Sequence, residues 1–289
     1  MRKALAQVVR NDWSWSLLNA TLLRAARAAE WERSRSERIA RDERMENLVS
    51  RISPDLRVKH GVFEGMRYPS RAAVGSQLLP KLLGSYETEL QELVERICSA
   101  DYTDIVNIGC AEGYYAVGLA MRMPGVTVHA YDLDDDARRL CRQMAELNNV
   151  SSRVIIGAFC DADRLTSIEF KDRALIISDC EGYEKQLFTE GVASFLAAHD
   201  VLVEIHDFID IEISSRLRRV FAPTHDIEVL ESVDDIRKVH DYAYDELEGL
   251  DLSARKEVLA ERRPAAMQWF FMKTRLPTVV ARETAASLR

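Results

Sequence analysis

The stretch DIVNIGCAEGYYAVGL, residues 104–119, decides the fold of this chain. It begins as an apolar strand, passes through a turn that contains glycines, and continues in a pattern typical of a helix. Gly109 lets the chain turn sharply out of the strand, while Ala111 and Gly113 keep side chains small where a ligand would lie against the helix N-terminus. This strand, turn and helix are typical of one half of a nucleotide site.

The other half of such a site is an acid about 20 residues further on, at the end of the next strand. Asp132, which closes VTVHAYD (residues 126–132), meets this expectation and is predicted to hydrogen-bond ribose hydroxyls. A dinucleotide such as NAD calls for GxGxxG, but residues 109–113 read GCAEG, and Glu112 would repel two phosphates. A ligand with one nucleoside and a cationic amino-acid end, such as S-adenosylmethionine, suits this turn better.

Short apolar runs alternate with helical stretches from residue 104 to residue 207. This alternation is typical of a parallel sheet covered on both faces, so we predict an α/β fold with a doubly wound, mostly parallel sheet. Two runs beyond it, DIEVLES (residues 226–232) and MQWFFMKT (residues 267–274), are rich in strand formers. Residues 234–263, between these runs, are polar and helical in pattern.

The region before the sheet is predicted to be a helical N-terminal extension, because neither Gly nor Pro occurs before residue 54. Its apolar face, with Trp13 and Trp15, would dock on a second copy of the chain to form a homodimer, dock on the core, or serve as a simple packing extension. The predicted parts are this extension (1–56), a lid and pre-core helix (57–100), a nucleotide-binding domain (101–276) and a C-terminal tail (277–289).

The charge and the apolar content of the chain exclude two classes of binding partner, nucleic acids and membranes, from what we expect. The 289 residues contain 39 Lys and Arg against 47 Asp and Glu, a net charge of −8, so a nucleic-acid partner is not expected. No apolar run approaches the ~18 residues of a membrane span, and no signal peptide is indicated, so no membrane partner is expected. The five cysteines show no CxxC spacing, which is typical of reduced thiols in a cytoplasmic protein.

Three motifs carry a resemblance to a known family: VNIGCAEGYYAVGLA (residues 106–120), SDCEGYE (residues 178–184) and VEIHDF (residues 203–208). With them, the stretch from about residue 63 to residue 208 resembles the FkbM-like group of class I S-adenosylmethionine-dependent methyltransferases. The resemblance implies a Rossmann-like methyltransferase fold. The turn of that family usually opens with an acid that steers the amino-acid end of the cofactor, and Asn107 stands there in this chain. Glu87 or Glu112 would then have to supply the missing charge.

The resemblance also implies where the cofactor would lie. The turn would hold the methionine part, Asp132 the ribose, and residues 159–161 the adenine, under a lid formed by KLLGSYE (residues 81–87). The implied cofactor-binding residues are Glu87, Asn107, Gly109, Ala111, Glu112, Gly113, Tyr114, Tyr115, Asp132, Leu133, Phe159, Cys160, Asp161 and Asp179.

Methyl transfer to a hydroxyl requires a base or a metal ion, because the hydroxyl proton must leave. The ends of two predicted strands offer Asp179, Glu181, His206 and Asp207, which should face one crevice. His206 is the preferred base, since the unperturbed pKa of His is about 6.5, and Asp207 or Glu181 would orient it. Alternatively, Asp179, Glu181 and Asp207 would bind Mg²⁺. A further alternative is that Glu181 and Glu184 merely cap and charge the first turn of the next helix.

These residues together predict an O-methyltransferase that acts on a small-molecule or glycan-type acceptor. Two alternatives remain at this point. One is an NAD-type oxidoreductase, against which the missing GxGxxG argues. The other is a catalytically silent cofactor-binding interaction protein, which Asn107 in place of an acid keeps open.

Overall fold

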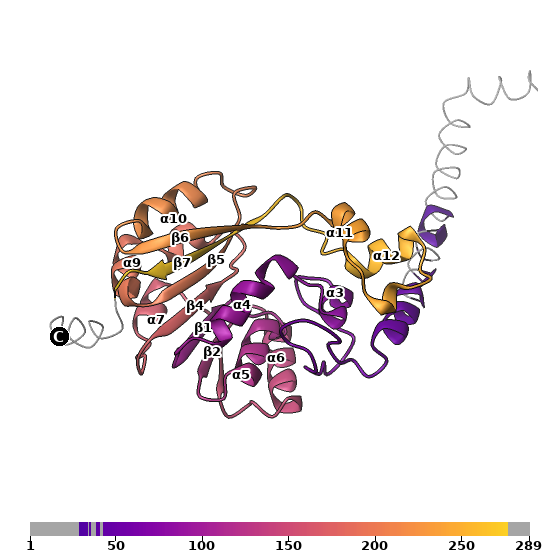
Figure 1. Cartoon of the computed structure of the whole chain (residues 1–289), viewed down its shortest axis with the longest axis horizontal. Coiled ribbons are helices and arrows are strands. Elements are labelled where there is room, and N and C mark those ends of the chain that lie inside the picture. Colours follow the sequence, from indigo (N-terminus) through magenta and orange to yellow (C-terminus); the bar gives the residue numbers. More distant parts are fainter. Residues whose placement is uncertain (1–28, 34, 36–38, 41–42, 277–289) are drawn as a thin grey trace, which may run out of the picture. The chain divides into compact units, whose positions relative to one another are not determined.

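The computed structural model describes residues 29–276, except residues 34, 36–38 and 41–42 (Figure 1). The chain divides into two units, Met1–Leu48 and Val49–Arg289. In the first unit, the described residues are helical and mostly exposed. Trp13 and Trp15 lie outside the described residues, so the N-terminal extension as a docking element stays a prediction.

The second unit is built on a seven-stranded sheet with the strand order β3-β2-β1-β4-β5-β7-β6. Five strands run parallel, and β7 is antiparallel to both of its neighbours. The strands are β1 (Asp104–Ile108), β2 (Thr127–Tyr131), β3 (Val154–Gly157), β4 (Ala174–Ser178), β5 (Asp200–Ile205), β6 (His225–Glu231) and β7 (Gln268–Thr274). The prediction of a doubly wound, mostly parallel sheet is therefore confirmed.

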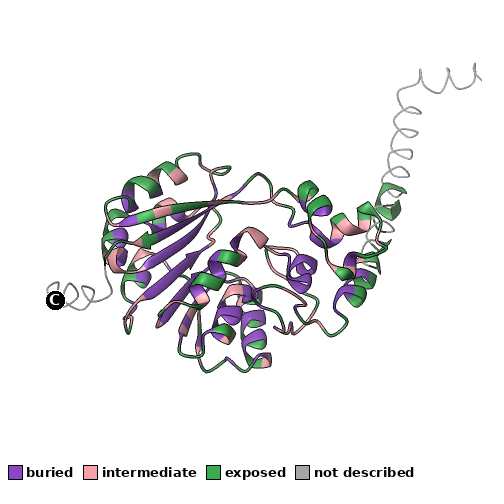
Figure 2. Cartoon of the chain, in the orientation of Figure 1, coloured by how far each residue is buried: buried purple, intermediate pink, exposed green. Residues whose placement is uncertain are grey.

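Helices cover both faces of this sheet (Figure 1). They are α3 (Leu78–Leu83), η1 (Thr88–Leu90), α4 (Gln91–Cys98), α5 (Tyr114–Arg122), α6 (Asp135–Leu147), α7 (Ala162–Thr166), α8 (Glu184–Leu187), α9 (Glu190–Phe195), η2 (Leu196–Ala198), α10 (Ile213–Phe221), α11 (Asp235–Asp241), η3 (Asp245–Leu247) and α12 (Leu252–Leu259). Apolar side chains of α7, α8, α9 and α10 pack on the face that bears Val106, Ile108 and Ile176. Every residue of β1, β4 and β5 is buried, as continuous apolar strands between two helical layers should be (Figure 2).

Two segments outside the regular strand–helix alternation lie beside each other. Helix α3 precedes the sheet and ends at Gly84, whose left-handed backbone (φ +90°) lies so close to the His60 carbonyl that a Cβ would clash with it. The stretch predicted as one helical region between β6 and β7 forms α11, η3 and α12, and α12 contacts α3. Together these segments bring residues from both ends of the domain to the carboxyl edge of the sheet.

No helix among the described residues is both long and apolar enough to cross a membrane.

Candidate active site

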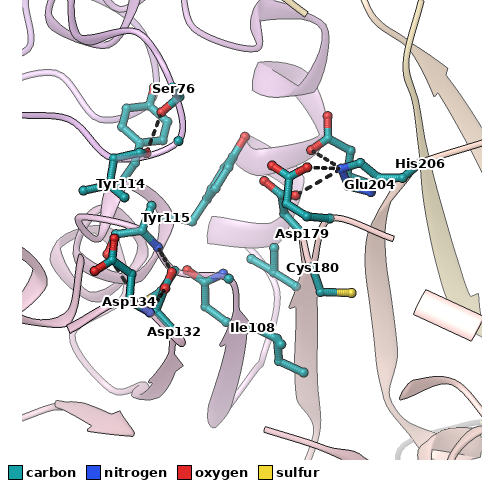
Figure 3. Close-up of a pocket in the computed structure, with 18 of the residues that line it drawn as sticks. Ser76, Ile108, Tyr114, Tyr115, Asp132, Asp134, Asp179, Cys180, Glu204 and His206 are labelled. Atoms are coloured by element: carbon teal, nitrogen blue, oxygen red, sulfur yellow. Dashed lines mark hydrogen bonds and ion pairs between the residues drawn. The ribbon is translucent and has the colours of Figure 1, made fainter. Parts of the chain in front are cut away.

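A cavity of about 700 Å³ opens at the carboxyl ends of β1, β2, β4 and β5. Ligands of open α/β sheets bind at this edge, because the chain reverses there and leaves a crevice. Figure 3 shows Asp132 and Asp134 on one side of the close-up, with Asp179, Glu204 and His206 together on the other. The cavity therefore has two chemically different ends.

The turn after β1 forms the first end. The N–H groups of Gly109 and Cys110 both donate to the Tyr131 carbonyl, at 2.8 and 2.9 Å. Gly109 has φ +77°, and a Cβ there would lie 1.7 Å from the Asp179 carbonyl oxygen. Ala111 is also left-handed, with φ +47°. The turn is thus pressed against the ends of both neighbouring strands, which leaves its outer surface to a ligand.

Asp132 is held against this turn by two backbone donors. Its Oδ2 accepts from the N–H of Ala111 at 2.8 Å, and its Oδ1 accepts from the N–H of Asp134 at 2.9 Å. A carboxylate has about four acceptor positions, so two remain for a ligand diol. Next to it, Leu133 and Phe159 line the cavity with side chains that are 73 % and 46 % exposed.

Asn107 lies on β1 beneath the turn and lines the cavity. It is 2 % exposed, yet its Oδ1 has no hydrogen-bond partner in the described part of the chain. A buried acceptor without a partner is costly, which indicates that a donor from a ligand belongs there.

Glu87 comes to the cavity from the segment between α3 and η1. Its carboxylate accepts from the Tyr115 hydroxyl and from Arg263 Nη2, the latter at 2.8 Å. Burial raises the pKa of Glu87 to about 7; Arg263 lowers it, while the carboxylates of Glu204 and Glu261 raise it further.

Arg263 was missed by the sequence analysis. It follows α12 and pairs with three buried carboxylates, those of Glu87, Glu204 and Glu261. It thereby connects the segment between β6 and β7 with β5 and with the segment between α3 and η1. No local motif surrounds Arg263, and its partners Glu87 and Glu204 are distant in sequence, so no sequence signal could have identified it.

His206 forms the second end of the cavity. Its Nδ1 lies 2.6 Å from Oε1 of Glu184, and both residues are buried. Its Nε2 lies 3.5 Å from Asp179 Oδ1, 3.5 Å from Glu181 Oε2 and 3.9 Å from Glu204 Oε2. Burial opposes the protonated imidazole, but the Glu184 hydrogen bond and the surrounding carboxylates outweigh it and raise the pKa of His206.

Asp179 shares this end. Burial, together with the carboxylates of Glu204, Glu87 and Glu181, raises its pKa well above the usual range. Asp179, Glu181 and His206 thus lie in one crevice, as predicted from the ends of parallel strands. Glu184, which was expected only to charge the first turn of a helix, both begins α8 and contacts His206.

Four expected site residues do not line the cavity. Glu112 is buried in an ion pair with Lys81, with 2.5 Å between Oε1 and Nζ, so Lys81 neutralises the charge of Glu112. Asp161 caps α7 by accepting from the N–H of Arg164, and Asp207 accepts from the N–H of Ser214 near the start of α10. Gly113 packs against Cys141. The other cofactor-binding residues expected from the sequence, Glu87, Asn107, Gly109, Ala111, Tyr114, Tyr115, Asp132, Leu133, Phe159, Cys160 and Asp179, all line it.

The fold and the cavity define the class of protein structurally. A mostly parallel seven-stranded sheet, with an antiparallel strand inserted next to its edge and a crevice at the glycine turn, is the doubly wound, Rossmann-like sheet expected from the sequence.

Comparison with known proteins agrees with this class over part of the chain. A release factor glutamine methyltransferase from Chlorobaculum tepidum is 36 % identical over 88 residues, which are 28 % of this chain and 29 % of the relative. The chain thus matches less than a third of that relative's length. No family model matches the chain.

Similar solved structures share little sequence with this chain. A putative O-methyltransferase from Klebsiella pneumoniae has a TM-score of 0.45 and 11 % identity, covering 80 % of this chain and 90 % of that chain. A precorrin-6y C5,15-methyltransferase from Geobacter metallireducens has a TM-score of 0.43 and 12 % identity, covering 64 % of this chain and 88 % of that chain.

Proposed function

We propose that this protein binds S-adenosylmethionine in the cavity and transfers its methyl group to an oxygen of a small-molecule or glycan-type acceptor. The proposal is carried by two observations: Asp132, with acceptor positions to spare, and carboxylates lie at opposite ends of the cavity, and the buried Oδ1 of Asn107, which lines it, has no hydrogen-bond partner among the described residues. A nucleoside with a cationic tail needs both ends. The short match to a methyltransferase supports the same donor.

The exposed side chains of Leu133 and Phe159 would contact the adenine, and Asp132 the ribose hydroxyls. The methionine part would follow the turn toward Asn107, whose Oδ1 would accept from the ammonium group. Glu87 and Asp179, which both line the cavity, would supply the negative charge that Asn107 lacks. Glu112 cannot do so, because Lys81 already neutralises it.

In the reaction, the acceptor oxygen would displace the sulfonium sulfur at the methyl carbon. The C–S electron pair stays on sulfur, and the acceptor's proton must leave. Because a carboxylate only accepts, Glu184 holds the proton on Nδ1 of His206, which leaves Nε2 of the neutral ring free to take the acceptor's proton. Membership of the FkbM-like group, a cytoplasmic location and a homodimer formed through the N-terminal helices are further proposals that rest on the sequence.

Isothermal titration with S-adenosylmethionine and with NAD tests the ligand class. We expect binding of S-adenosylmethionine alone; binding of NAD alone would establish the oxidoreductase instead. Binding of S-adenosylmethionine without transfer to a broad panel of hydroxyl acceptors would favour the silent binding protein.

Asp132→Ala should weaken S-adenosylmethionine binding by about 1–3 kcal/mol, because a buried diol loses its acceptor. Asp161→Ala is the matched control: it removes a carboxylate that caps α7 outside the cavity and should leave the affinity unchanged. Wild-type affinity in Asp132→Ala would show that the ribose lies elsewhere.

His206→Ala should lower kcat roughly 100-fold while S-adenosylmethionine affinity stays near wild type, because the proton acceptor is lost and the donor pocket is not. His60→Ala, which removes a histidine paired with Glu246 outside the cavity, should leave kcat unchanged. An unaltered kcat in His206→Ala would remove this residue from the mechanism.

A further inference from the structure

The buried histidine of the cavity is held in one tautomer. Nδ1 of His206 lies 2.6 Å from a carboxylate oxygen of Glu184, which is fully buried. Since a carboxylate accepts, Nδ1 carries the proton, and the lone pair of the neutral ring is on Nε2. The same arrangement, a carboxylate behind the histidine, orients metal-bound histidines in proteins.

Nε2 of His206 faces carboxyl oxygen atoms of Asp179 and Glu181. Asp179 Oδ1 and Glu181 Oε2 each lie 3.5 Å away, at the outer limit of hydrogen-bonding distance. Asp179 Oδ1 is buried and has no hydrogen-bond partner among the residues that the structure describes. A lone pair and two carboxylates that converge on one point call for a cation between them.

The spacing of these atoms fits direct coordination. One ligand atom from each of Asp179, Glu181 and His206 can be chosen so that all three lie within 4.8 Å of one another. Two ligands at about 2.1 Å from a tetrahedral Zn²⁺ ion would be about 3.4 Å apart. The two separations of 3.5 Å between Nε2 and the carboxyl oxygen atoms agree with that value.

The backbone at Glu181 brings its carboxylate into this position. Glu181 has φ +51° and Gly182 has φ +96°, so two consecutive residues are left-handed immediately after β4. For a non-glycine residue this conformation costs about 1 kcal/mol or more, and such strain is typical of sites of function. Glu181 is mostly exposed, so burial of its side chain does not explain the turn.

We propose that Asp179, Glu181 and His206 form a binding site for a divalent transition-metal ion of the Zn²⁺ class, with Glu184 as the residue that positions His206. The sequence had suggested Mg²⁺ on oxygen atoms of Asp179, Glu181 and Asp207. In the structure Asp207 bonds to α10 instead. A ligand set with one imidazole favours Zn²⁺ and similar ions over Mg²⁺.

The cationic side chains near the site neutralise other carboxylates. Arg263 is directed at Glu87, Glu204 and Glu261, and Lys238 pairs with Glu261. Among the residues that the structure describes, no lysine or arginine side chain forms an ion pair with Asp179 or Glu181, so the ion would balance the charges of these two side chains. The role of the ion in catalysis rests on the proposed methyl transfer: the ion would bind the acceptor oxygen and lower the pKa of that hydroxyl, so that the proton leaves to solvent. With the ion bound, Nε2 of His206 is a ligand and does not take the proton; the base role of His206 given above belongs to the metal-free site.

The test uses Co²⁺ as a spectroscopic substitute for Zn²⁺, added to the full chain that has been treated with a chelator. We expect one tight site, with visible absorption stronger than that of the aqueous ion and no thiolate charge-transfer band. Glu181→Gln, an isosteric change of a mostly exposed side chain, should weaken Co²⁺ binding at least 10-fold. Glu190→Gln, at another exposed glutamate, should bind Co²⁺ like the wild type.

Asp179→Asn provides a second ligand variant with the same expected loss. The proposal is overturned if the wild type has no tight Co²⁺ site, if the ligand variants bind as tightly as the wild type, or if thiolate bands show that cysteines hold the ion. Titration with S-adenosylmethionine separates the two proposals. Donor binding without a Co²⁺ site overturns only the metal site, whereas a Co²⁺ site without donor binding overturns only the proposed methyl transfer.

Discussion

Gly109 is required by a contact between two strand ends rather than by ligand approach alone. Its φ of +77° and the distance of 1.7 Å from an added Cβ to the Asp179 carbonyl leave no room for a side chain. Because Asp179 is itself a site residue, Gly109 sets the distance between the two ends of the cavity.

Gly109→Ala should therefore destabilise the fold by more than about 3 kcal/mol, since both the backbone conformation and the close contact are violated. Urea unfolding measures the effect. Gly125→Ala is the control, because Gly125 has open space around its Cβ position and should change stability by less than about 0.5 kcal/mol. Equal stability of the two variants would contradict the contact at Gly109.

Residues with left-handed backbone conformations are concentrated around the cavity. Six non-glycine residues in the described part of the chain have positive φ, and four of them line the cavity: Glu87, Ala111, Glu181 and Arg262. Strain of this kind persists only where the surrounding structure enforces it. Its position here agrees with a site whose side chains are held in place before a ligand binds.

Helix α3 is joined to the turn after β1 by a buried ion pair. Lys81 and Glu112 are 3 % and 1 % exposed, and Glu112 also accepts from the N–H of Val74. Glu112 therefore anchors α3 and the segment before it, and it does not line the cavity.

Removing one member of this pair leaves the other charge buried without a partner. Lys81→Met and Glu112→Gln should each cost about 3–5 kcal/mol in the free energy of unfolding, and the double variant should cost clearly less than their sum. Arg237→Met, which breaks an exposed pair with Asp241, should cost less than about 1 kcal/mol. Strict additivity of the two buried changes would show that the charges do not interact.

The stability of the whole domain should depend on pH through His199, which lies where β5 begins. Burial lowers the pKa of His199 from 6.5 to about 4. Its Nδ1 accepts from the N–H of Ala174 at 3.1 Å, which requires the neutral form. Above pH 6.5 neither state carries the proton, whereas between pH 6.5 and about 4 the unfolded chain takes up a proton that the folded chain does not.

Wild-type stability should therefore fall as the pH is lowered through this window. His199→Asn keeps an acceptor near Nδ1 but does not titrate, so from about pH 7 to about pH 5 it should lose roughly 2 kcal/mol less stability than the wild type. Urea unfolding at the two pH values measures the difference. Parallel losses in both proteins would show that His199 is not the group responsible.

The sequence by itself determined the sheet, the glycine turn and the acid after β2, because each depends on residues that are close together in the chain. It also predicted that Asp179, Glu181 and His206 would meet, since parallel strands present their carboxyl ends at one edge. The sequence did not predict the direction in which each of these side chains points. Asp161 and Asp207 stand at strand ends too, yet each turns toward a backbone N–H at a helix start.

Only the tertiary structure decided which charges meet in the cavity. Arg263 reaches Glu87 and Glu204 because the segment between β6 and β7 comes back over the sheet edge, and Glu112 is removed from the site by a lysine of α3. Ion pairs between distant segments leave no periodic pattern in a sequence. The sequence does not distinguish a charged residue that will be buried from one that will be exposed, because burial depends on the folded chain.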